Sequence, residues 1–589
     1  MVILAEQNQV PSTQQKYIAL FTQFAALLLL WLPNVFTPLD STEAGKIRYM
    51  EAIGLGGILW ILAAALCGSS KRLLLICIPF AAILPLELWT RIYYGTPINE
   101  HIIALAWESN IAEGFNLIQT YGSSMLLVYI GSAIIFFAGL RYSISLNIHW
   151  QHRSRYFYIL IFLPVLFLFS WVKQDSVSLK TKENPSHSYF DDQFNTNWLS
   201  QWSDVFPVNI FYFSDIFLKQ KEKMTKARNS LMGKSLEAKQ VDPSSQPEIA
   251  IVVIGESASA FHWGVFGYSR DTTPALQKRD GIVFFSNVVS LSSATRTAIP
   301  GVLSRRPLLT PSGTVDWESE PSFLKAFSEV GYSTHWISNQ APLGQHDTSI
   351  SIYAQDADDV RFLNPGTYSG RGNYDEVLLK PLEEIISQPG RHTIVMHLMG
   401  SHFDYELRYP AKFKIFQSKT KSLEDSIPAE TSNQLIDINS YDNSLAYTDY
   451  ILEKIIDYTE KKSRRSILVY FSDHGVDLPR GRCVVRGASR VSETSFHVPA
   501  FLWASSTFRE KNKKKWTIAT ENADQPYSTK AIFSTILDLS GIQIANGLPP
   551  ENFLVKPLAS SPRLVATSNG VLVDFDKSKK KNPCYITSN

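Results

Sequence analysis

The sequence predicts an α-helical membrane domain followed by a soluble α/β domain with a mostly parallel central sheet. Long uncharged runs crowd the first third of the chain. From residue 248 onward, short β-branched runs alternate with helical patterns, which is typical of a parallel sheet covered by helices on both faces. A chain of 589 residues is also too long for one hydrophobic core. We therefore expect three regions, with 1–175 in the membrane, 176–247 as a connecting segment and 248–589 as the soluble domain.

Five apolar stretches approach the roughly 20 residues that a helix needs to cross a bilayer. They are residues 17–36, 49–67, 73–93, 123–140 and 156–172. A single stretch of this kind could be a buried core helix, and the first could be a cleavable signal peptide. Five closely spaced stretches cannot all hide inside a small soluble core, so we expect five transmembrane helices.

Basic residues in the short loops predict the orientation, because such loops stay in the cytoplasm. Lys71 and Arg72 lie between the second and third spans, and Arg141 and Arg153 lie between the fourth and fifth. The long loop 94–122 has glutamates but no Lys or Arg. Five crossings from a cytoplasmic N-terminus then place the soluble domain outside the cytoplasm.

The connecting segment is rich in aromatic residues between 194 and 218. Aromatic side chains at this density beside a membrane favour a segment that lies at the lipid headgroups. The alternative is a helix packed against the soluble domain. Residues 219–246 are charged and Ser-rich, which is typical of a linker.

Composition gives no reason to expect nucleic acid as a partner, and it does not decide the role of the cysteines. The chain has 56 Lys and Arg against 54 Asp and Glu, so it offers no general attraction to nucleic acid. Its 4 cysteines are too few for a disulfide framework. Cys483 and Cys584 lie in the predicted outer domain and could form one bridge. Alternatively, Cys483 is a zinc ligand.

The soluble domain has a regular succession of predicted elements. The expected strands are 249–254, 282–289, 334–338, 393–398, 466–471 and 498–503. The expected helices are 322–330, 374–387 and 441–460.

Several of these strands are followed directly by residues that bind metals. Glu256, His402 and the pair Asp473–His474 each follow a predicted strand. Because the carboxyl ends of parallel strands meet at one edge of a sheet, we expect these side chains to converge there. Carboxylate and imidazole groups are zinc ligands, although any one of them alone could be an ordinary turn residue. His497 precedes its strand, so it joins the others only if that strand is antiparallel.

A nucleophile is available in the hydroxyl-rich turn 290–300, which enters a predicted helix. A helix N-terminus attracts phosphate, and a metal can activate a hydroxyl. The alternative is ordinary capping of the helix by Ser or Thr. The pattern alone does not choose between Thr295 and Thr297.

Several motifs together resemble the phosphoethanolamine transferases of the alkaline phosphatase and sulfatase superfamily. They are IVVIGESA at 251–258, FGYSRDTTP at 266–274, ATRTA at 294–298, MGSH at 399–402, SDHG at 472–475 and HVP at 497–499. The resemblance covers the membrane part and nearly all of the soluble domain. It implies a sulfatase-like fold for 248–589.

The resemblance also implies a site, a cofactor and partners. Zinc would be held by Glu256, Thr297, Asp473 and His474, with Thr297 as nucleophile. His402 and His497 would face the phosphoryl group or a second zinc. Phosphatidylethanolamine would be the donor, and a cell-envelope glycan or glycolipid the acceptor. We expect a monomeric, multi-pass protein of the bacterial inner membrane, in contact with membrane lipid and with its catalytic domain in the periplasm.

Departures from the family pattern indicate which acceptor is modified. Val476 and Asp477 replace the Glu-Ser that often follows the Asp-His-Gly motif, and the segment WISNQ at 336–340 is similar to the branch that modifies lipopolysaccharide core sugar. The core is therefore the expected acceptor, rather than lipid A. By the same resemblance, Asn339 and Glu113 are expected to contact substrate.

Three other functions share some of these features. A phosphoglycerol transferase or a sulfatase-like hydrolase could use the same metal site, although TAIPG at 297–301 lacks the Cys/Ser-x-Pro-x-Arg signature of sulfatases. A non-catalytic membrane receptor would need only the spans and a binding domain. Glu87 and Arg91, one turn apart in a span, are expected to pair with each other rather than to line a transport pathway.

Overall fold

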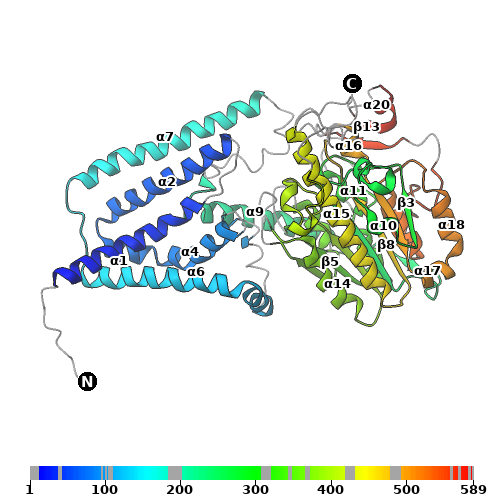
Figure 1. Cartoon of the computed structure of the whole chain (residues 1–589), viewed down its shortest axis with the longest axis horizontal. Coiled ribbons are helices and arrows are strands. Elements are labelled where there is room, and N and C mark those ends of the chain that lie inside the picture. The colour runs from blue at the N-terminus through cyan, green and yellow to red at the C-terminus, as the bar shows by residue number, and fades with distance from the viewer. Residues whose placement is uncertain are drawn as a thin grey trace, which may run out of the picture. The chain divides into compact units, whose positions relative to one another are not determined.

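The computed structural model divides into two compact units, Met1–Leu218 and Lys219–Asn589. It describes residues 12–36, 43–93, 97–99, 102–103, 111–183, 202–231, 233–306, 320–341, 348–364, 372–417, 432–477, 492–557, 562–567, 572–581 and 586. Figure 1 shows the first unit as helices and the second as a sheet with helices around it.

The first unit is a helical bundle (Figure 1). Its helices are α1 (Thr13–Trp31), α2 (Glu43–Cys67), α3 (Ser70–Ile76), α4 (Ile78–Tyr93), α6 (Ile111–Ser145) and α7 (Ser154–Glu183). Helix α1 packs along α6, and α2 packs along α7. Helix α9 (Val208–Leu231) begins in this unit and carries the chain onward.

Three helical segments of the described chain are long and apolar enough to cross a membrane, namely Thr13–Phe36, Tyr49–Cys67 and Leu126–Ser145. Helices α3 and α4 meet at a 62° bend and make a fourth if they are one broken span. The described apolar part of α7, Ser154–Phe169, is shorter. The helical membrane region is thus present with three or four candidate spans, and the expected five are not confirmed.

Glu87 and Arg91 pair inside the bundle, as the sequence predicted. Arg91 Nε lies 2.7 Å from Glu87 Oε1, and both side chains are fully buried. Asn209 Nδ2 and the Ile98 N–H also donate to the Glu87 carboxylate, at 3.0 and 2.8 Å. The guanidinium donates further to the Asp204 carbonyl at 3.0 Å. These bonds satisfy both charges and tie α4 to the start of α9.

The aromatic connecting segment is partly packed where the structure describes it, although Phe211 is exposed. Trp202, Val205 and Phe206 are buried in the first unit. Asn34 fixes the chain there, because its Oδ1 accepts the Phe206 N–H at 2.8 Å. The bundle therefore covers these three side chains, and the position of the segment relative to the lipid headgroups stays a prediction.

The second unit is built on a seven-stranded sheet of order β3-β9-β8-β2-β7-β5-β6 (Figure 1). The strands are β2 (Ile249–Gly255), β3 (Ile282–Phe285), β5 (Ser333–Ser338), β6 (Asp359–Phe362), β7 (His392–His397), β8 (Ser466–Ser472) and β9 (Ala500–Ala504). All neighbours pair in parallel except β9, which is antiparallel to β3 and β8. The predicted, mostly parallel sheet is confirmed.

The central strand β2 is apolar throughout because both faces of the sheet are covered. Ala250, Val252 and Ile254 pack in the core beneath α11 (Thr295–Leu303), α12 (Phe323–Glu329) and α19 (Ala531–Leu539). Ile249, Ile251 and Val253 pack in the core beneath α14 (Leu379–Ile386) and α15 (Ser432–Glu460). Alternate side chains thus enter opposite cores and hold β2 in the middle of the domain.

Two predicted elements differ from the structure. The expected strand 282–289 stops at Phe285, and a second strand, β4 (Val288–Val289), pairs with β10 (Tyr527–Ser528) instead. The expected helix 441–460 begins earlier, at Ser432. The break after β3 matters for function because β4 delivers the chain to the hydroxyl-rich turn and α11.

Candidate metal centre

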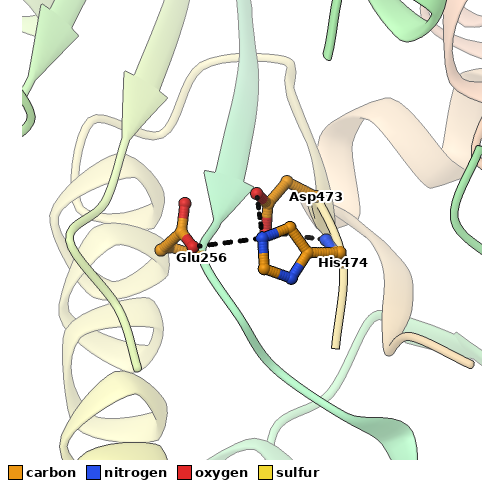
Figure 2. Close-up of side chains that lie close together, drawn as sticks. All are labelled: Glu256, Asp473 and His474. Atoms are coloured by element: carbon orange, nitrogen blue, oxygen red, sulfur yellow. Dashed lines mark hydrogen bonds and ion pairs between the residues drawn. The ribbon is translucent and has the colours of Figure 1, made fainter. Parts of the chain in front are cut away.

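Three ligand-type side chains converge at the carboxyl ends of two neighbouring strands (Figure 2). Glu256 follows β2, and Asp473 and His474 follow β8. His474 Nε2 lies 3.5 Å from Glu256 Oε1 and 3.3 Å from Asp473 Oδ2. One ligand atom from each residue falls within 4.8 Å of the others, and all three side chains are buried.

The backbone around the cluster orients its ligand atoms. Asp473 Oδ1 accepts the N–H groups of Ser257 and His474, at 3.0 and 2.7 Å. Its Oδ2 is buried without a hydrogen-bond partner in the described chain. His474 Nδ1 lies 2.6 Å from the Gly475 carbonyl and donates to it, which leaves Nε2 free of a proton as a ligand atom.

The electrostatics favour a cation between the carboxylates. Burial, and then the charge of Glu256, raises the pKa of Asp473 well above its usual value. Burial alone would raise the pKa of Glu256 too, but His474, His402 and hydrogen bonds outweigh it and lower that pKa. These directions favour a protonated Asp473 beside an ionised Glu256, and a divalent ion would displace the proton of Asp473.

The donor set fits zinc. Zinc accepts carboxylate oxygen and imidazole nitrogen as ligands, and three protein ligands leave a fourth position open for substrate. Asp473 Oδ2 supports this fit, because it is buried beside His474 Nε2 without a hydrogen bond from the described residues, and a bound ion would compensate it for lost water.

A threonine hydroxyl reaches the cluster, and it belongs to Thr295. Its Oγ1 lies 3.3 Å from Glu256 Oε2 and 3.2 Å from His474 Nε2. Thr295 is the first residue of α11 and is partly exposed. Thr297 is only 6% exposed, and no hydrogen bond joins its hydroxyl to the cluster in the described chain. Residues two apart on a helix point about 200° away from each other, so one turn cannot present both.

His402 lies at the edge of the cluster. The turn that carries it is held on β2, because the Leu398 and Ser401 N–H groups donate to the carbonyls of Ile254 and Glu256, both at 2.9 Å. Burial lowers the pKa of His402, and the Glu256 carboxylate opposes that effect. A neutral imidazole here can accept a proton.

His497 is not brought to the cluster. Strand β9 is antiparallel, so the residue before it does lie at the expected edge of the sheet. Its ring nevertheless turns away, with Nε2 donating to the Ser286 carbonyl at 2.8 Å and an edge-to-face contact with Phe261. Burial lowers the pKa of His497 to about 4. Its surroundings are those of a neutral, structural histidine.

Asn339 and Glu113 are the two residues expected from the family resemblance to contact substrate. Asn339 is fully buried, and its Nδ2 donates to the Asn373 carbonyl at 3.0 Å and to Asp375 at 2.8 Å. The Asn339 NH2 group is therefore engaged by protein, whereas its Oδ1 is buried with no hydrogen-bond partner among the described residues. The side chain of Glu113 lies outside the described residues, as do Cys483 and Cys584.

Two further residues contact the site and were not predicted from the sequence. Gln340 Nε2 donates to Glu256 Oε2 at 3.1 Å, and Asp375 accepts the N–H groups of Met399 and Gly400. Gln340 could have been noticed because it too follows a strand of the sheet. Asp375 lies in a short helical turn and has no such signal in the sequence.

Known proteins share this architecture. Residues 249–542 match the sulfatase family. Phosphoethanolamine transferase EptC of Escherichia coli K12 is 24% identical over 544 residues, 88% of this chain and 89% of that protein. Phosphoethanolamine transferase CptA of Salmonella typhimurium is 25% identical over 570 residues, 93% of this chain and 89% of that protein.

A solved structure gives the same result for the second unit. The C-terminal periplasmic domain of EptC from Escherichia coli, crystallised in complex with Zn, is 26% identical with a TM-score of 0.50, and the match covers 58% of this chain and 95% of that one. The chain thus has a sulfatase-family domain of the alkaline phosphatase superfamily, and most of its length is similar to proteins named phosphoethanolamine transferase.

Proposed function

We propose that this protein transfers phosphoethanolamine from phosphatidylethanolamine to a cell-envelope glycan or glycolipid, through a covalent threonine intermediate at a zinc site. The observation that carries the proposal is the placement of a hydroxyl, Thr295 Oγ1, within 3.3 Å of two members of the Glu256, Asp473 and His474 cluster. The names of the homologous transferases and the zinc complex of EptC support it.

The membrane part supports a lipid donor. Helices apolar enough to span a bilayer precede the catalytic unit, and the EptC relative is named for a periplasmic C-terminal domain. We place the protein in the inner membrane with its catalytic unit in the periplasm. Phosphatidylethanolamine in the same membrane then needs no soluble carrier.

Zinc held by Glu256, Asp473 and His474 would lower the pKa of a neighbouring hydroxyl and offset negative charge on the phosphoryl group. We propose Thr295 as the nucleophile because its hydroxyl touches the cluster and is partly exposed. The N-terminus of α11 adds backbone N–H groups that suit a phosphate. Thr297, which the family resemblance implied, points into the interior.

The proposed reaction has two displacements at phosphorus, first by Thr295 and then by the acceptor. The Thr295 oxygen bonds to phosphorus as the bond to the diacylglycerol oxygen breaks, and the threonine proton ends on that oxygen with His402 as its carrier. An acceptor oxygen then bonds to the phosphorus of the phosphoethanolamine on Thr295 as the bond from that phosphorus to the Thr295 oxygen breaks. The proton of the acceptor hydroxyl passes through His402 to the Thr295 oxygen, which restores the threonine hydroxyl.

The acceptor we propose is the core sugar of lipopolysaccharide, as the WISNQ pattern at 336–340 implies. The test is mass spectrometry of envelope glycolipids and glycans from cells that make the wild type or Thr295→Ala. A phosphoethanolamine increment that requires Thr295 identifies reaction and acceptor together. Absence of this increment from every envelope fraction would contradict the proposal. A second assay with labelled phosphatidylglycerol as donor distinguishes phosphoethanolamine transfer from phosphoglycerol transfer.

A further inference from the structure

Two adjacent residues at the end of β5, Asn339 and Gln340, each hold a different part of the site. We infer that this pair is a two-armed positioning element, in which Gln340 orients the metal ligand Glu256 and Asn339 acts through Asp375 to fix the turn that carries His402. The inference rests on the proposed metal centre and assigns to both residues a role apart from substrate contact.

The first arm is a direct hydrogen bond to the ligand. Gln340 is 1% exposed, and its Nε2 donates to Glu256 Oε2 at 3.1 Å and to the Leu398 carbonyl at 2.8 Å. Ser257 Oγ donates to the other oxygen, Glu256 Oε1, at 2.6 Å. Each carboxylate oxygen thus has its own donor, so the plane of the carboxylate cannot rotate away from the ion. Partners of this kind sustain metal affinity.

Gln340 is itself held in place. Its backbone N–H donates to Ser338 Oγ at 3.0 Å, at the last residue of β5. The shared contact with the Leu398 carbonyl joins the side chain to the chain just beyond β7. The amide is therefore supported from two strands of the sheet before it reaches Glu256.

The second arm passes through a buried carboxylate. Asp375 is 3% exposed and accepts three hydrogen bonds, from Asn339 Nδ2 at 2.8 Å, the Met399 N–H at 2.7 Å and the Gly400 N–H at 2.9 Å. The turn so held is tight, because Gly400 has φ +51° and a Cβ there would lie 2.8 Å from the Glu256 carbonyl oxygen. The His402 N–H closes the turn on the Met399 carbonyl at 3.3 Å.

The two arms can act independently because the two side chains bond to different partners, Asn339 to Asp375 and Gln340 to Glu256. The Asn339 N–H donates to the His397 carbonyl at 2.9 Å and so continues the pairing of β5 with β7. From this fixed backbone, one amide reaches Asp375 and the next reaches Glu256. The inference therefore predicts that a change at Gln340 weakens metal binding and that a change at Asn339 slows proton transfer.

The experiment compares Gln340→Met, Asn339→Ala and Asp375→Asn in the full chain in detergent. Gln340→Met keeps the length of the side chain but loses its N–H donor. We expect its zinc affinity, measured by competition with a chelator, to fall about 10- to 100-fold, with kcat largely restored at saturating zinc. Asn339→Ala and Asp375→Asn should hold zinc within about twofold of wild type but lose kcat about tenfold or more, since a displaced His402 transfers protons poorly.

Matched controls are Gln388→Met and Glu376→Gln, which change an exposed amide and an exposed carboxylate beside Asp375. Both should bind zinc and turn over as wild type does. If Asp375→Asn does not fold, Asn339→Ala decides the second arm, because it leaves Asp375 in place. Wild-type zinc affinity in Gln340→Met, or wild-type kcat in Asn339→Ala, overturns the inference. The zinc measurement needs no substrate, so a wild type that binds zinc without transferring phosphoethanolamine counts against the proposed function alone.

Discussion

Thr295 Oγ1 lies 3.2 Å from His474 Nε2, although 179 residues separate them in the chain. The contact exists because α11 starts where the chain leaves β4, and His474 follows β8 at the same edge of the sheet. A hydroxyl and a metal-type imidazole at this distance can both face one phosphoryl group.

Thr295→Ala should abolish the covalent phosphoethanolamine adduct and lower transfer by at least about a thousandfold, because the attacking oxygen is gone. Thr297→Ala should keep the adduct, since that side chain is buried away from the cluster. Intact-mass spectrometry after incubation with phosphatidylethanolamine makes the comparison. Loss of the adduct in Thr297→Ala with its survival in Thr295→Ala would assign the nucleophile to Thr297 instead.

Removal of metal should inactivate the protein and destabilise its second unit, because Glu256 and Asp473 would be left as a buried pair of acids. Zinc restored to about 100 times its dissociation constant should add about 2.7 kcal/mol of stability. Thermal unfolding with and without chelator measures the effect. Asp473→Asn should lose this response and Glu376→Gln should keep it, whereas an equal response in both would argue against the site.

Asp449 should make the stability of the second unit depend on pH. Burial raises its pKa to about 7, and the N–H groups of Ala275 and Leu276, at 2.9 and 3.0 Å, only partly oppose this. The folded pKa lies above the unfolded one, so the contribution of Asp449 is complete below about pH 4 and is lost as pH rises through 7. Denaturant unfolding of wild type and Asp449→Asn across pH 4–8 checks this. The variant should show a smaller decline, and an unchanged decline would contradict the prediction.

Arg91→Met should destabilise the first unit by about 3–5 kcal/mol, because it leaves the buried Glu87 carboxylate without its cation. Replacing both residues by Met should cost less than Arg91→Met alone. Thermal unfolding of the full chain in detergent compares the variants. Glu222→Gln, which breaks the exposed pair with Lys226, is the control and should change nothing measurable. Equal effects of the buried and exposed changes would refute the role of burial.

The parallel sheet and the ligand cluster could be predicted because they depend on local patterns. Apolar runs such as 249–254 mark buried strands, and the carboxyl ends of parallel strands always meet at one edge. Glu256, Asp473 and His474 could therefore be grouped before their distances were known. The broken strand after Phe285 could not be predicted, because its second half pairs with residues more than 200 positions away.

By itself, the sequence determined that the chain has an apolar helical part, a mostly parallel α/β unit and metal-ligating residues at the strand ends. The tertiary structure decided which side chains complete the centre. It placed the Thr295 hydroxyl beside Glu256 and His474, turned His497 towards Ser286, and engaged Asn339 with Asp375. The physical reason is that residue type and strand position are local properties, whereas the direction of a side chain depends on the partners that distant segments bring to it.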